Sequence, residues 1–77
     1  MFFKKQRKII YIEGMNCEHC VKKIEETLEN LVDISKAKVN LKKKCAIVTY
    51  ENGADDILLT QAIEKLGYTI TGIKELS

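Results

Sequence analysis

Two cysteines, Cys17 and Cys20, are the residues best suited to chemistry, and they form a C-x-x-C pair. A third cysteine, Cys45, makes the count odd, which argues against a scaffold built only from disulfides. In a reducing cytosol a C-x-x-C pair stays in the thiol form, where it serves either as a soft-metal site or as a redox pair. The choice between these two chemistries is the main functional question that the sequence raises.

The position of the pair favours thiolates. Apolar residues recur after it at steps of three and four, which predicts a helix over residues 18–31. Cys17 then lies at the start of this helix and Cys20 one turn further, so that both sulfurs lie on one side. A helix N-terminus carries free N–H groups and a partial positive charge, and both stabilise thiolate over thiol. Because the thiolate is the form that binds metals, the position suits a metal site.

The number and type of ligands distinguish the candidate chemistries. Two soft sulfurs suit Cu(I), which accepts low coordination, whereas a structural zinc site needs a second ligand pair that the sequence lacks. A C-x-x-C at a helix start is also the thioredoxin arrangement, so a redox protein stays an alternative. Against it, the chain has no proline and cannot place a cis-proline against its cysteines. A catalytic cysteine–histidine pair is disfavoured, because His19, the only histidine, points away from Cys17 as its neighbour in the same turn.

Strand and helix patterns surround the pair. Alternating apolar residues predict strands over 8–13, 34–41, 45–51 and 69–75. A second helix is predicted to begin at Asp55 or Asp56, either of which can cap it, and to end at Leu66 before Gly67. With right-handed crossovers, this β-α-β-β-α-β order gives an α+β, ferredoxin-like fold: a four-stranded antiparallel sheet with both helices on one face.

The predicted topology brings three loops to one end of the domain, called the thiol end below. These loops are the C-x-x-C loop, the hairpin of residues 42–44 and the Gly67–Tyr68 loop. The chain therefore places its thiols where loops from both halves of the sequence can surround them.

Length and composition narrow the class of protein. The chain has 77 residues, 45% hydrophobic and 31% charged, which predicts one globular domain over residues 1–77. A net charge of +2 is too small to argue for nucleic-acid binding, and no apolar run approaches the length of a membrane span. The first fourteen residues lack the pattern of a secretory signal, so we expect a cytoplasmic protein that binds neither nucleic acid nor membranes.

The motif GMNCEHC, over residues 14–20, resembles the G-M-x-C-x-x-C motif of the heavy-metal-associated domain. The resemblance covers residues 9–74 and includes the order of the elements. The C-x-H-C variant and the Gly67–Tyr68 pair look like those of small bacterial copper chaperones.

This resemblance implies a Cu(I)-binding metallochaperone, not an enzyme, that delivers Cu(I) by thiolate exchange to the metal-binding domain of a copper-transporting P-type ATPase. Cys17 and Cys20 would be the ligands, and Zn(II), Ag(I) or Hg(II) are alternative ions in vitro. We expect a monomer without metal, with a metal-bridged homodimer as an open alternative.

The same domain also occurs as an N-terminal module of such ATPases and in mercury-binding proteins. A chain that starts at Met1 and stops shortly after its last strand favours the free-standing chaperone over the ATPase module. The mercury carriers are usually exported, so the lack of a secretory signal counts against them.

Other residues are predicted to support the site. Met15 is expected to fill the core beneath the loop rather than to bind metal through its thioether. His19 either tunes the acidity of the thiols, binds the ion weakly from outside or is an inert surface residue, and the sequence leaves this open. The Tyr68 ring is expected to shield the sulfurs from water. Cys45 is expected to be an exposed thiol on the sheet face opposite the helices.

Several lysines are predicted at or near the thiol end. We call them the docking lysines: Lys22, Lys23, Lys42, Lys43, Lys44 and Lys65. They form either ordinary solvated surface or a docking patch for an acidic partner domain.

Overall fold

The computed structural model describes residues 6–51 and 53–76 of the chain. The elements are β1 (Gln6–Glu13), α1 (Glu18–Glu29), β2 (Ile34–Asn40), β3 (Cys45–Tyr50), α2 (Asp56–Lys65) and β4 (Thr69–Glu75). Their order is the predicted one, and each boundary lies within two residues of its predicted position.

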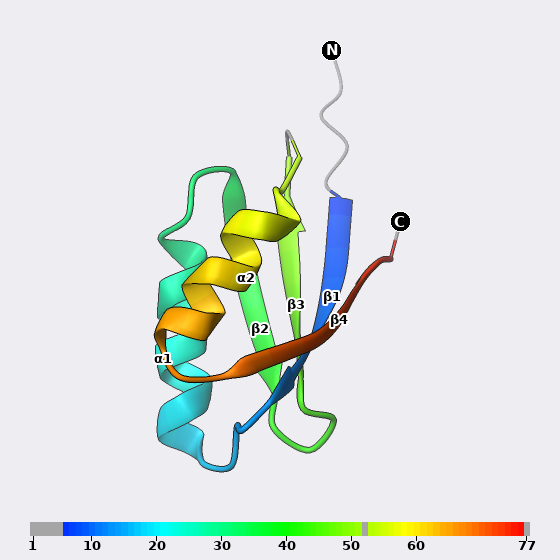
Figure 1. Ribbon diagram of the computed structural model, residues 1–77. Helices are drawn as coiled ribbons and strands as arrows, with labels where there is room; N and C mark the ends of the chain where they lie inside the picture. Colours follow the sequence, from blue (N-terminus) through cyan, green and yellow to red (C-terminus); the bar gives the residue numbers. More distant parts are fainter. Residues whose placement is uncertain (1–5, 52, 77) are drawn as a thin grey trace.

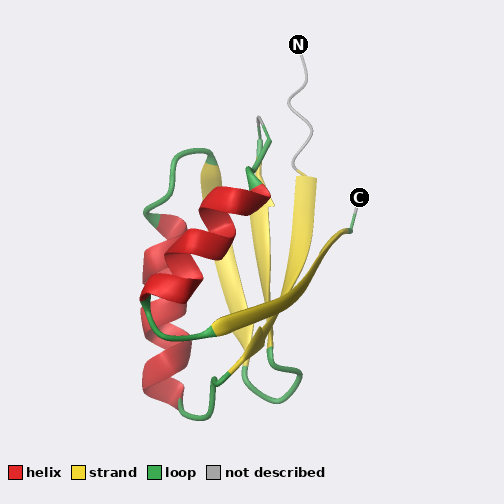
Figure 2. Ribbon diagram, in the orientation of Figure 1, coloured by secondary structure: helices red, strands yellow, loops and turns green. Residues whose placement is uncertain are grey.

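The strands form one four-stranded sheet in the order β2-β3-β1-β4, and all neighbouring strands are antiparallel. Both helices lie on one face of the sheet and leave the other face, the outer face, uncovered (Figure 1, Figure 2). The predicted ferredoxin-like fold is therefore confirmed.

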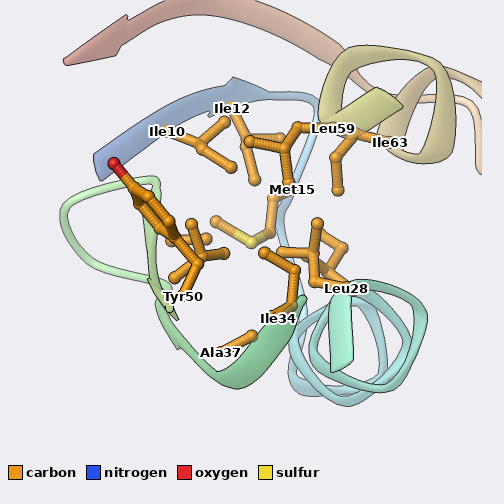
Figure 3. Close-up of a cluster of buried hydrophobic side chains, with 12 residues drawn as sticks. Ile10, Ile12, Met15, Leu28, Ile34, Ala37, Tyr50, Leu59 and Ile63 are labelled. Atoms are coloured by element: carbon orange, nitrogen blue, oxygen red, sulfur yellow. The ribbon is translucent and has the colours of Figure 1, made fainter. Parts of the chain in front are cut away.

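The core lies between the sheet and the two helices (Figure 3). Alternate residues of β1 and β3 and the predicted stripes of both helices supply its most buried side chains, each at most 1% exposed. These are Ile10, Ile12, Ile24, Leu28, Ala46, Val48, Leu59 and Ile63. Burying a valine, leucine or isoleucine side chain stabilises a fold by about 1.5–3 kcal/mol, so these contacts hold both helices to the sheet.

The ends of α2 follow from its flanking residues. The Asp55 carboxylate accepts a hydrogen bond from the Ile57 backbone N–H at 2.9 Å and thereby caps the helix. Gly67 has a φ of +98°, the left-handed conformation that glycine adopts without steric cost. Both signals were predicted from the sequence. Together they set the point where the chain leaves α2 for Tyr68 and β4.

Three loops meet at the thiol end. The loop before α1 and the β2–β3 hairpin lie at the same end of the molecule (Figure 1). The Ile12 backbone N–H donates to the Lys44 carbonyl at 2.9 Å, which ties the hairpin to the end of β1. The third loop contributes Tyr68, and a Cβ at Gly14 would lie 3.5 Å from Cδ1 of this ring. The predicted convergence of these loops is therefore observed.

A buried lysine, which sequence analysis did not single out, occupies the opposite end. Lys8 is 7% exposed, and its ammonium group donates to the Asp56 carboxylate and to the Ala54 carbonyl, both at 2.7 Å. The ammonium also lies 5.4 Å from the centre of the Tyr50 ring. Burial lowers the pKa of Lys8, but the hydrogen bond and charge of Asp56 outweigh it and leave that pKa raised. Lys8 therefore anchors the first turn of α2 to β1.

The prediction for Cys45 was wrong. Cys45 is 2% exposed, although the alternation of side chains along β3 directs it to the outer face of the sheet. It occupies a central strand, where its cross-strand neighbours are Tyr11 on β1 and Asn40 on β2. Larger side chains directly opposite on the same face cover a small side chain between them. Alternation identified the face of Cys45 but not the size of its neighbours.

No helix in the described part of the chain is long and apolar enough to cross a membrane.

Candidate metal centre

The loop that carries the thiols is anchored from below. Gly14 has a φ of +94°, which lets the chain turn sharply at the end of β1. The next side chain, Met15, is 2% exposed and belongs to the core cluster (Figure 3). The buried position predicted for Met15 is therefore observed. This anchor fixes the base of the loop, whereas Asn16 and Cys17 above it are exposed.

Cys17 is the N-cap of α1. Its backbone is extended, and no side-chain hydrogen bond caps the helix there. The Cys17 carbonyl accepts hydrogen bonds from the backbone N–H groups of Cys20, at 3.1 Å, and Val21, at 3.4 Å. This first turn places Cys20 directly after the loop, and the two sulfurs lie 3.2 Å apart. The two thiols are free, Cys17 is exposed and Cys20 is half-buried, so the pair is accessible from one side.

Tyr68 controls the acidity of the inner thiol. A hydrogen bond from the Tyr68 side chain is the largest cause that lowers the pKa of Cys20 to about 7, and a hydrogen bond with Cys17 is the second. Burial opposes them, while the backbone groups of Asn16 and Cys17 lower this pKa further. The pKa of Tyr68 is raised to about 12, first by its hydrogen bond to Cys20 and then by burial. The tyrosine therefore keeps its proton at neutral pH, and its hydroxyl can donate a hydrogen bond to a Cys20 thiolate.

The effect of the Tyr68 hydroxyl on the pKa of Cys20 was not predicted from the sequence. The ring was predicted to shield the sulfurs, and the structure brings it to Cys20 and Gly14. No spacing in the sequence signals a hydrogen bond between residues so far apart in the chain. Only the path of the chain from α2 into β4 reveals it.

The remaining predicted site residues are exposed. His19 is exposed in the first turn of α1, next to Cys20. All six docking lysines are exposed. Lys22 and Lys23 follow Cys20, the β2–β3 hairpin carries the three lysines of residues 42–44, and Lys65 ends α2. Over residues 6–51 and 53–76, no group of three or more His, Cys, Asp or Glu side chains is placed to hold a metal ion.

A family model described as "Heavy-metal-associated domain" matches residues 9–69, which include the loop, both thiols and Tyr68. The chain belongs to the heavy-metal-associated domain family. The predicted resemblance is thereby confirmed.

Individual members of this family are also similar. The chain is 41% identical over 58 residues to a copper chaperone CopZ of Enterococcus hirae, covering 74% of this chain and 84% of that protein. It is 37% identical over 57 residues to copper-transporting ATPase 2 of Rhizobium meliloti, covering 74% of this chain but 7% of the ATPase. The N-terminal domain of a potential copper-translocating P-type ATPase from Bacillus subtilis, solved in its Cu(I)-loaded state, matches with a TM-score of 0.81 and 29% identity. That match covers 96% of this chain and 94% of that domain. These three relatives are thus a copper chaperone, a copper-transporting ATPase and a domain of a potential copper-translocating ATPase.

Proposed function

We propose that the chain works as one heavy-metal-associated domain that binds Cu(I) through Cys17 and Cys20 and passes it on, without catalysing a reaction. The observation that carries this proposal is the pair of free thiols, 3.2 Å apart at an uncapped helix start. Two thiolates suit Cu(I), which accepts low coordination by sulfur. The similarity to CopZ proteins and to a Cu(I)-loaded ATPase domain supports the same ion.

Binding requires a small opening of the pair. Zinc–thiolate bonds are about 2.3 Å long, and bonds of about that length would place the sulfurs of a linear complex about 4.6 Å apart. The sulfurs are separated by 3.2 Å in the structure, so one of them moves outward when the ion enters. Cys17 is the exposed partner on the loop side, while Cys20 is held by the first helical turn and by Tyr68. We therefore assign the movement to Cys17.

Transfer then proceeds by ligand exchange. A thiolate of the acceptor forms a bond to the two-coordinate ion, and a three-coordinate bridged complex results. The bond to Cys17 breaks next, and the Cys20 bond follows as a second acceptor thiolate binds. Copper stays Cu(I) throughout, and each departing thiolate keeps its electron pair. Exposure of Cys17 makes the first exchange fast, because the attacking sulfur meets no covering side chain.

The surrounding residues have supporting roles in this proposal. Met15 holds the base of the loop, the Tyr68 hydroxyl stabilises the Cys20 thiolate, and its ring limits the access of water. His19 contributes to the local acidity or remains inert. The docking lysines steer an acidic acceptor toward the thiol end.

We propose a cytoplasmic copper chaperone whose acceptor is the metal-binding domain of a copper-transporting P-type ATPase. The similarity to CopZ over most of the length of both chains supports it. A second candidate is a metal-binding module of such an ATPase, which the similarity to ATPase domains supports. The two candidates share the site and the ion and differ only in what the domain is attached to.

A competitive titration tests the assignment of the site. Cu(I) is added under anaerobic, reducing conditions in the presence of a chromogenic chelator. We expect Cys17→Ser or Cys20→Ser to lower Cu(I) affinity by more than about a hundredfold, since even residues that only support metal ligands cost about 10–100-fold. Cys45→Ala is the matched control, because it removes a thiol outside the pair and should leave the affinity unchanged. Wild-type affinity in the double serine variant would reject the site.

The redox alternative has its own test. A dithiol reductase should reduce the disulfides of insulin in a reaction that depends on Cys17. We expect no turnover above the rate of the Cys17→Ser variant. Turnover that this variant abolishes would replace the metal carrier with a redox protein.

A further inference from the structure

The uncovered outer face of the sheet carries a groove, distinct from the thiol end. Its volume is about 320 Å³. Strand β3 forms its floor, and side chains of β2 and β1 form its walls. The lining residues that matter are Arg7, Lys36, Lys38, Asn40, Ile47 and Thr49. Neither helix contributes to this groove, and the proposed metal transfer does not use it.

The walls of the groove carry positive charge that nothing in the described structure neutralises. Thr49 of β3 pairs with Lys36 on β2 and with Arg7 on β1. Two residues earlier on β3, Ile47 pairs with Lys38. All three cations are exposed, and the sole salt bridge among the described residues joins two other residues, Lys8 and Asp56. No carboxylate lines the groove. A ligand of this surface must therefore be anionic.

The adjacent sheet edge is closed, which determines how a polypeptide can bind. Strand β2 is an edge strand, so alternate backbone N–H groups on it lack a strand partner. Two of these groups, at Ala37 and Val39, donate instead to carboxylates of α1: to Glu29 at 3.2 Å and to Glu25 at 2.9 Å. A partner strand cannot pair with these groups without displacing them. A ligand has to lie on the face of the sheet, over β3.

We propose that this groove binds an extended, acidic segment of a partner protein, with carboxylates at every second residue. Lys36 and Lys38 are two residues apart on one face of a strand, which spaces them about 6.6 Å apart. Every second side chain of an extended segment has the same spacing. The side chains between them point away from the sheet, so only the carboxylates face the groove.

Single-stranded nucleic acid fits this groove less well. Such ligands need aromatic side chains on which bases stack, and the groove is lined by aliphatic and polar ones. Charge alone would attract both ligands, so the test compares them directly.

The test is a binding measurement by fluorescence anisotropy with the full chain and labelled peptides of about ten residues. One peptide alternates glutamate and valine, and a second has the same composition with its glutamates grouped together. We expect the alternating peptide to bind about tenfold more tightly, because only its carboxylates match the lysine spacing. Equal affinity of the two peptides would overturn the proposed extended geometry.

Charge reversal locates the site. We expect Lys36→Glu with Lys38→Glu to lower the affinity of the alternating peptide about tenfold. Lys22→Glu with Lys23→Glu is the matched control, since it makes the same change in net charge at the thiol end. Equal loss in the two double variants would assign binding to net charge and overturn the proposal. Arg7→Glu changes the opposite wall of the groove, on β1, and should also lower the affinity of the alternating peptide. Misfolding of β2 could not explain a loss of affinity in this variant.

Two further outcomes would also overturn the proposal. One is tighter binding of a thymidine oligonucleotide with the same number of charges. The other is self-association in analytical ultracentrifugation that Lys36→Glu with Lys38→Glu abolishes, because the occupant would then be a second copy of this chain. Unchanged Cu(I) affinity is expected in Lys36→Glu with Lys38→Glu and in Arg7→Glu, because the groove contains no thiol, and this separates the proposal from that of the metal site.

Discussion

The two ends of the domain differ in whether their polar groups have partners within the fold. At one end, the Lys8 ammonium is buried and has a carboxylate, a carbonyl and an aromatic ring around it. At the other end, Cys17 is exposed and Cys20 is half-buried, at an uncapped helix start. The Lys8 ammonium is occupied by partners within the fold, whereas the sulfurs of Cys17 and Cys20 are available to a ligand. A polar group that is satisfied within the fold stabilises it, whereas one left available can bind.

The largest expected effect in this comparison is on stability, at the lysine end. Lys8→Met keeps the length of the side chain but removes the hydrogen bonds to Asp56 and Ala54. We expect the free energy of unfolding to fall by about 1–2 kcal/mol, a range discounted because the Asp56 side chain is 57% exposed. Urea denaturation measures this change.

The matched control is Lys74→Met, an exposed lysine on β4. A change at an exposed position away from such contacts is usually within about 0.5 kcal/mol. Cu(I) affinity should be unchanged in both variants. If Lys8→Met weakened Cu(I) binding as much as it weakened the fold, the two ends would not be independent.

The next effect concerns the acidity of Cys20. Tyr68→Phe keeps the ring but removes the hydroxyl that chiefly lowers the pKa of Cys20 to about 7. We expect this pKa to rise toward its ordinary value of 9.0. The rate of iodoacetamide alkylation is measured against pH in proteins that also carry both Cys17→Ser and Cys45→Ala, so that Cys20 is the remaining cysteine. The midpoint of this profile reports the pKa of Cys20.

The same pKa sets the sign of a pH effect on binding. Above pH 7 Cys20 is mostly thiolate, so Cu(I) displaces little proton from it. Below pH 7 proton competition should reduce the apparent affinity by up to about tenfold per pH unit for this thiol. In Tyr68→Phe the decline should begin at a higher pH. An identical profile in the two proteins would restrict Tyr68 to covering the sulfurs.

The smallest expected effect is on the rate of transfer. Reversing Lys22 and Lys23 to Glu should slow Cu(I) transfer to an acidic acceptor domain several-fold, because exposed charges act mainly on encounter. Transfer from the wild-type protein should slow as salt rises, since the Debye length falls from about 30 Å at 0.01 M to about 8 Å at 0.15 M. Stopped-flow measurements across a salt series test both. A rate that is independent of salt and of the reversal would leave these lysines as solvated surface.

The features that the sequence predicted well depend on local patterns. The apolar stripes of both helices, the Asp55 cap and the left-handed Gly67 each follow from residues within a few positions of one another. The C-x-x-C pair at the start of α1 belongs to the same class, because one turn of helix determines its geometry.

The features that the sequence did not reveal depend on contacts between distant segments. Lys8 is in phase with Ile10 and Ile12, so its inward direction was visible, but its partner Asp56 lies 48 residues away. The burial of Cys45 depends on neighbours from two other strands. The effect of Tyr68 on the pKa of Cys20 likewise depends on how the segment between α2 and β4 lies against the first turn of α1. Periodicity gives the direction of a side chain, and only the assembled fold gives its partner.

The carboxylates of Glu25 and Glu29 on the β2 edge have a consequence for solubility. A bare edge strand is a template on which other chains can add strands and aggregate. A carrier that meets its acceptor by diffusion benefits from abundance, and abundance raises the rate of such misassembly. Because α1 holds a thiol in its first turn and bonds to the edge from its last two turns, one helix would serve both the proposed delivery of metal and the protection of the sheet edge. Substituting both glutamates with alanine would therefore limit the usable concentration of the protein while leaving its thiols in place.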